Sequence, residues 1–148
     1  MSLKIPTTYK EWSDILEQFA TGENDKDVVE RMKTGSLSWQ SGVAERFITR
    51  FSTVINLRLD QATKTFQKRM TQANGAEGVI VQALLQLRKE MILLEDAVSI
   101  NALPADMRKT FVKLIQDQRT SIQDTLIDSA KSERSGKLMS IIRNNKLK

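Results

Sequence analysis

The apolar residues of this chain recur at helical spacing over most of its length. In the longest regular run they follow one another at steps of three or four, with a mean close to the 3.6 residues of one helical turn. This run predicts a helix from Ser38 to Ala73, about 50 Å long at 1.5 Å per residue. The Asn74-Gly75 pair is expected to end it. Its apolar positions are Ala44, Ile48, Phe51, Ile55, Leu59, Ala62, Phe66, Met70 and Ala73.

A second run, between residues 80 and 98, repeats at steps of 4, 3, 4, 3 and 4, which is the heptad pattern of packed helices. The segment VIVQALL at 79–85 could form a buried strand by composition alone, but it lies inside the heptads, so we predict helix. Leu103-Pro104 ends this helix. The heptad positions are Ile80, Leu84, Leu87, Met91, Leu94 and Val98, and Ala83, Ile92 and Ala97 are expected to broaden the buried face.

The C-terminal third predicts one long helix after Pro104 and a short one after Gly136. Three apolar residues of the short helix are expected to fold back onto the bundle over residues 137–143; docking of these three on a membrane surface is a weaker alternative. They are Leu138, Ile141 and Ile142, and the predicted buried face of the long helix is Met107, Phe111, Leu114, Ile115, Ile122, Leu126 and Ala130.

Two short helices are predicted at the N-terminal end. Thr8 and Glu11 have the spacing of a capping box, in which each side chain accepts a hydrogen bond from the other residue's backbone N–H. Gly22 is placed to end the first helix, and Asn24 or Asp25 to cap the second. Gly35 is placed to end the second helix.

These elements predict an all-α fold: an antiparallel helical bundle with two short N-terminal helices and three long helices. The chain has 148 residues, of which 40% are hydrophobic and 28% are charged, as in a soluble globular domain. We expect one domain over residues 1–143 and a flexible basic tail over residues 144–148.

The composition argues against most catalysis. The chain has no cysteine and no histidine, so it lacks the usual thiol nucleophile, the commonest general base and the commonest transition-metal ligand. The acids at residues 11, 14, 17, 27 and 30 share helix faces but are expected to face solvent rather than a metal. We therefore expect a non-enzymatic protein without cofactor or metal. Without a long apolar run or a signal peptide, the cytoplasm is the expected location.

The net charge of +5 is confined to the C-terminal segment. Residues 131–148 carry six basic side chains and one acidic, whereas residues 1–130 carry 17 of each. A nucleic-acid-associated protein that contacts phosphates through this segment is therefore one hypothesis for function, and such binding would depend strongly on salt. The candidate phosphate-contacting residues are Lys131, Arg134, Lys137 and Arg143.

Charges elsewhere suggest how the helices meet. Residues 1–30 carry a net −4 and residues 38–73 a net +4, so the acidic hairpin is expected to fold back on the long helix. Arg46, Arg50, Arg58 and Arg69 could otherwise form a partial basic ridge on that helix. Arg119 lies near an apolar stripe, where we expect it to extend its charged end to water. A buried pair between Arg119 and either Glu95 or Asp60 is the alternative.

The favoured hypothesis for function is an interaction module, either an adaptor or a regulator. It would bind a protein partner, or a second copy in a homo-oligomer, through an apolar helix face. The aromatic residues Trp12, Trp39, Phe47 and Phe51 either tie the short helices to the long ones or form an exposed groove. The candidate partner-binding residues are Trp39, Phe47, Leu87, Met91 and Leu94.

Overall fold

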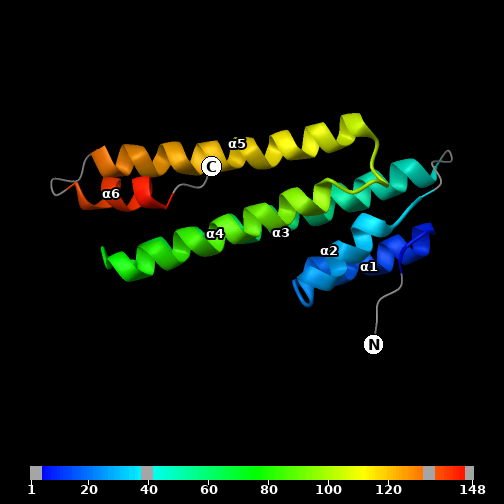
Figure 1. Ribbon diagram of the computed structural model, residues 1–148, viewed down its shortest axis with the longest axis horizontal. Helices are drawn as coiled ribbons and strands as arrows, with labels where there is room; N and C mark the ends of the chain where they lie inside the picture. Colours follow the sequence, from blue (N-terminus) through cyan, green and yellow to red (C-terminus); the bar gives the residue numbers. More distant parts are fainter. Residues whose placement is uncertain (1–4, 38–41, 132–135, 146–148) are drawn as a thin grey trace.

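The computed structural model describes residues 5–37, 42–131 and 136–145, and within them it confirms the all-α bundle (Figure 1). Two short helices, three long helices and a short final helix follow one another along the chain. They are α1 (Tyr9–Thr21), α2 (Asp25–Thr34), α3 (Val43–Ala73), α4 (Glu77–Val98), α5 (Ala105–Lys131) and α6 (Lys137–Asn144).

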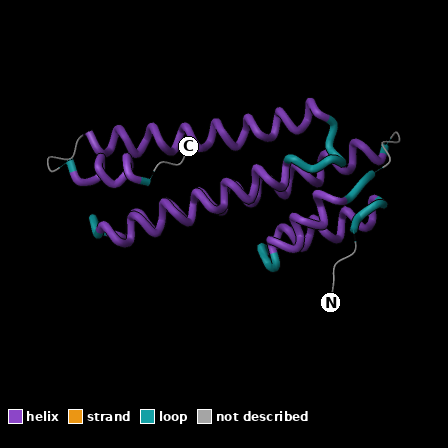
Figure 2. Tube along the Cα trace, viewed as in Figure 1, coloured by secondary structure: helices purple, strands orange, loops and turns teal. Residues whose placement is uncertain are grey.

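The antiparallel pair α3–α4 is the centre of the bundle. The α1–α2 hairpin covers one end of this pair, where α1 packs on α3 and α2 packs on α4. Helix α5 lies along α4 on the other side of the pair, and α6 turns back to pack on α5 and α4 (Figure 2). Helix α4 therefore packs against four other helices.

The caps of the N-terminal hairpin form as predicted. Thr8 Oγ1 accepts from the Glu11 backbone N–H at 3.2 Å, and Glu11 Oε1 accepts from the Thr7 and Thr8 backbone N–H groups at 3.2 Å each. Hydrogen bonds from Thr7, the largest cause, and from Thr8 lower the pKa of the Glu11 carboxyl group. Gly22 ends α1 with φ 80°, a left-handed conformation that favours glycine.

The predicted start of the longest helix is wrong. Helix α3 begins at Val43, because Gly42 before it has φ 86° and ψ −38°, a conformation outside the right-handed helix. A continuous helix from Ser38 is therefore impossible, although residues 38–41 themselves lie outside the described ranges. The predicted end is confirmed, since Asn74 and Gly75 both adopt left-handed conformations directly after Ala73.

The core follows the predicted stripes with two exceptions. Every heptad position of α4 is buried, as are Ile141 and Ile142 of α6, so this helix folds back as expected. Ile92 and Leu114, which were predicted to face inward, are 48% and 37% exposed. Leu114 lies at the margin of its stripe, whereas Ile92 lies on the side of α4 away from the heptad positions.

The last helix extends one residue beyond the predicted domain boundary. Asn144 belongs to α6, and the half-buried Asn145 donates from Nδ2 to the Ile141 carbonyl at 2.9 Å. Of the expected flexible tail, residues 146–148 lie outside the part of the chain that the structure describes.

Candidate functional site

Aromatic rings join three helices at the hairpin end of the bundle. The Trp12 ring on α1 packs edge-on against the Phe47 ring on α3, with the ring centres 5.1 Å apart. The Phe51 ring packs edge-on against the Phe111 ring on α5, also with 5.1 Å between ring centres. Trp12 Nε1 also donates to the Ser36 carbonyl at 2.8 Å. Phe47 is fully buried in this cluster, so it forms no exposed aromatic groove. Trp39 lies outside the described residues.

The most unusual group in the core is Arg58, which is only 5% exposed. Its Nη1 donates to the Phe19 carbonyl at 2.7 Å and to Asp25 Oδ1 at 2.9 Å. Its Nη2 donates to Asp25 Oδ2 at 2.9 Å and to Glu90 Oε2 at 3.0 Å. The guanidinium also lies 4.7 Å from the centre of the Phe19 ring. One side chain of α3 thus holds the end of α1, the start of α2 and the middle of α4.

The electrostatics of this group are those of a structural clamp. Burial acts to lower the pKa of Arg58, but the hydrogen bonds and charges of Asp25 and Glu90 outweigh it and raise the pKa. Arg58 is therefore permanently charged. Because two carboxylates share this one cation, the three side chains carry a net charge of −1. We call Arg58, Asp25 and Glu90 the arginine clamp.

The arginine clamp forms part of the lining of a cleft of about 240 Å³ between α3 and α4, beside the α1–α2 turn. Further polar groups reach it from both helices, namely Gln61, Thr65, Arg69 and Gln86. These groups can hydrogen-bond a small polar molecule. Among the described residues, no set of three or more acids is placed to hold a metal ion.

The arginine clamp was not predicted from the sequence, although the spacing of apolar residues in α3 indicated a buried position for Arg58. Arg58 follows Phe51 and Ile55 at steps of 4 and 3 and precedes Ala62 by 4, so it occupies an inward position of the helical stripe. The alternative of a partial basic ridge is therefore wrong for Arg58, and the preferred expectation of pairing with the acidic hairpin is correct for it. The folding of the acidic hairpin onto α3 is confirmed, and the Asp25–Arg58 pair is its most buried charged contact.

A second charged pair joins α4 to α5. Arg119 Nη1 lies 2.8 Å from Glu95 Oε1, and the arginine side chain is 12% exposed. The expectation that Arg119 would extend to water is wrong, and the alternative of a pair with Glu95 is correct. The pair forms because α4 and α5 pack side by side and bring both residues to their interface.

The remaining candidate partner-binding residues lie inside the bundle. Leu87, Met91 and Leu94 are at most 2% exposed, because they hold α4 to its neighbours within the chain. In this conformation they offer no surface to a partner. The apolar helix face expected to bind a partner is therefore not the heptad face of α4.

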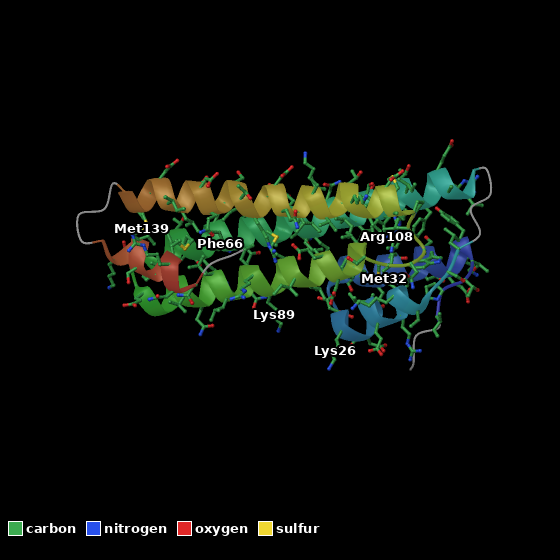
Figure 3. The ribbon with its side chains drawn as sticks, turned by 45° about the horizontal axis from the view of Figure 1, so that its top comes forward. Lys26, Met32, Phe66, Lys89, Arg108 and Met139 are labelled. Carbon is green, nitrogen blue, oxygen red and sulfur yellow. The ribbon has the colours of Figure 1, made fainter. Side chains whose placement is uncertain are left out.

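Two exposed apolar residues of α4 lie on the side of the helix away from its heptad positions. Leu85 and Ile92 are 45% and 48% exposed and stand seven residues, or about 10 Å, apart on one face. Arg88 and Lys89 are exposed between them, and neither forms an ion pair with any described residue. Figure 3 shows Lys89 on the side of α4 that faces away from α5. We call Leu85, Arg88, Lys89 and Ile92 the outer face of α4.

The candidate phosphate-contacting residues are only partly described. Lys137 and Arg143 are exposed on α6. The side chain of Lys131 and the whole of Arg134 lie outside the described part of the structure. Contact of these four residues with phosphate stays a prediction.

No protein-family model, curated protein or solved structure matches this chain. None of the helices within the described ranges is long and apolar enough to cross a membrane.

Proposed function

We propose that this chain is a non-enzymatic interaction module, an adaptor or regulator that binds a protein partner through the outer face of α4. The observation that carries the proposal is the pair of exposed side chains Leu85 and Ile92, spaced by one heptad. Apolar anchors at this spacing match the contact pattern of an amphipathic helix lying along another helix. We expect the module to act in the cytoplasm, since a chain without cysteine suits a reducing compartment.

The charges of the outer face select the kind of partner. Arg88 and Lys89 stand between the two apolar anchors, so a matching helix would carry acids between its own apolar residues. A second copy of this chain fits poorly. Antiparallel pairing of two α4 helices that sets Leu85 against Ile92 would place Arg88 of one copy against Lys89 of the other, and like charges repel. The occupant we propose is therefore an acidic amphipathic helix of another protein.

Photo-crosslinking from single positions tests this assignment in the full chain. A photoreactive phenylalanine replaces Leu85 in one variant and Leu57 in the control. Leu57 is a leucine of α3 with 43% exposure. The crosslinked segment of the partner is then identified by mass spectrometry. We expect position 85, but not position 57, to give an adduct with an acidic helical segment.

Charge reversal tests whether the positive charges of the outer face contribute to binding. Adding the Arg88→Glu and Lys89→Glu substitutions should abolish the adduct at position 85, because the acids of the partner would then be repelled. Equal crosslinking from positions 85 and 57, or crosslinking that charge reversal leaves unchanged, would overturn the proposal. An adduct between two copies of this chain would also overturn it and would assign the outer face to a homo-oligomer.

A further inference from the structure

A second surface lies where the start of α1 meets the first turns of α3. It is an open groove of about 500 Å³ lined by Tyr9, Glu45, Arg46, Thr49, Arg50 and Thr53. Arg46 and Arg50 stand four residues apart, so they lie one above the other on the same face of α3. This groove is separate from the outer face of α4 and from the arginine clamp.

The two arginines of this groove are not neutralised. Within the described ranges, neither forms an ion pair or a side-chain hydrogen bond. Arg50 is half-buried, and its Nε atom is fully buried with no hydrogen-bond acceptor. By contrast, the buried guanidinium groups of Arg58 and Arg119 each contact a carboxylate. The Nε atom of Arg119 is likewise buried without an acceptor, so what distinguishes Arg46 and Arg50 is that no carboxylate of the described residues balances either guanidinium group.

The lining suits a compact anion with several oxygens. An arginine pair offers N–H groups in the forked geometry that matches two oxygens of a phosphate. The Tyr9 and Thr49 hydroxyls can add neutral hydrogen bonds, whereas the Thr53 hydroxyl donates to the Thr49 carbonyl at 2.9 Å. Glu45 is the one acid among these lining residues, so together they carry a net charge of +1.

The surroundings of the groove disfavour a long polyanion. Residues 1–30, which include the whole of α1, carry three basic and seven acidic side chains. Their net charge of −4 would repel the neighbouring phosphates of a nucleic-acid strand laid along α1. A single phosphate group, by contrast, needs only the space between Arg46 and Arg50.

We propose that the groove formed by Tyr9, Arg46 and Arg50 is a binding site for a phosphate group, either free phosphate or the phosphate of a small organic ester. The geometry that carries the proposal is the pair of groove-lining arginines one helical turn apart on α3, neither of which forms an ion pair within the described residues. The site belongs to the chain itself and does not depend on the partner proposed for α4.

Titration of the full chain with inorganic phosphate tests the site directly. The amide signals of residues 45–53 are followed by NMR, with chloride at matched ionic strength as the reference. We expect saturable shifts with phosphate and none with chloride. The Arg50→Gln and Arg46→Gln variants should each bind phosphate at least about tenfold more weakly than the wild type, since each loses a charged hydrogen-bond partner. Lys68→Gln, at an exposed cation on the same helix, should bind like the wild type.

Further probes separate the source of the phosphate. Glycerol 3-phosphate that binds more tightly than inorganic phosphate would support a small ester, and equal binding would support free phosphate. A short single-stranded oligonucleotide without terminal phosphate that binds more tightly than either, and loses binding with Arg50→Gln, would overturn the compact-ligand proposal. Equal shifts with chloride and phosphate, or unchanged binding in Arg46→Gln, would also overturn it. Arg46 is exposed, so that variant is expected to fold even if Arg50→Gln does not.

Discussion

The two ends of this bundle are held together by different physics. At the hairpin end, the aromatic cluster and the arginine clamp combine large buried rings with directional charged hydrogen bonds. At the α6 end, apolar contacts dominate, and the contact between α3 and α5 nearby includes a neutral hydrogen bond from Gln118 Nε2 to Thr63 Oγ1 at 3.2 Å. Helix α4 has eight buried apolar residues, whereas the described side chains of the longer α5 include four.

This difference shows where the fold is most strongly specified. Apolar packing at the α6 end stabilises the fold by burial, which is non-directional and therefore tolerates small shifts of one helix along another. The arginine clamp accepts only one placement of the hairpin, because Arg58 must reach Phe19, Asp25 and Glu90 at once. We therefore expect the hairpin end to be rigid and the α6 end to open first.

The largest effect is expected from Phe51→Ala at the hairpin end. Phe51 is fully buried and joins the Phe47 and Phe111 rings, so its truncation leaves a cavity shared by α3 and α5. We expect a loss of about 4 kcal/mol in the free energy of unfolding, measured by urea denaturation. Leu57→Ala, at an exposed position of the same helix, should change it by less than about 0.5 kcal/mol. A loss as small as in this control would show that the Phe51 ring contributes little to the stability of the hairpin end.

Breaking the arginine clamp should rank second. Arg58→Met keeps most of the side-chain volume but leaves Asp25 and Glu90 facing each other without a cation. We expect a loss of about 3 kcal/mol, because an uncompensated charge in a largely buried place is strongly unfavourable. Arg69→Met, an exposed arginine beside the same cleft, serves as the control and should be near neutral.

The charges can then be removed together to separate attraction from repulsion. Adding Asp25→Asn and Glu90→Gln to Arg58→Met should restore part of the lost stability, since no charge then remains unpaired. If this triple variant is no more stable than Arg58→Met alone, the loss in Arg58→Met does not come from unpaired charge on Asp25 and Glu90.

A smaller effect is expected from Ile142→Ala at the α6 end. Ile142 is 3% exposed, and its truncation should cost about 2 kcal/mol. The sharper measurement is hydrogen exchange. Amides of α6 should exchange faster in this variant, whereas amides of α1 should exchange as in the wild type. Equal acceleration at both ends would show that the bundle opens as one unit.

The smallest effect concerns the cap of α1. Thr8→Ala removes the acceptor for the Glu11 backbone N–H and should cost about 1 kcal/mol at neutral pH. The Glu11 carboxyl contributes stability that depends on pH. Its pKa is lowered in the folded chain, so its contribution is present above its unfolded pKa and is lost as pH falls through the folded pKa. The difference in stability between Glu11→Gln and the wild type should therefore shrink on acidification, and a difference independent of pH would contradict the capping box.

The sequence predicted the elements of this fold well because their causes are local. The capping box of α1, the left-handed residues after α3 and the heptads of α4 all depend on residues within one or two helical turns of each other. Gly42 was equally visible in the sequence, and the error at the start of α3 came from extending a hydrophobic pattern across a glycine that can leave the helix.

The candidate sites were predicted less well because they depend on distant residues. Arg58 is 33 residues from Asp25 and 32 from Glu90, and no local pattern specifies these pairs. The exposure of Ile92 and the burial of Phe47 likewise depend on which helices cover α4 and α3. The sequence placed Arg46 and Arg50 on one face of their helix, but the helices that leave this face and the outer face of α4 uncovered are set by the packing of the bundle.

The sequence by itself therefore determined the helices, most of their ends and the residues that must be shielded from water. These properties follow from backbone hydrogen bonding and side-chain periodicity within single segments. Only the tertiary structure decided which charges would be paired in the core and which would remain available at the surface. The physical reason is that burial and charge pairing depend on distances between helices, which are set by the packing of the whole bundle.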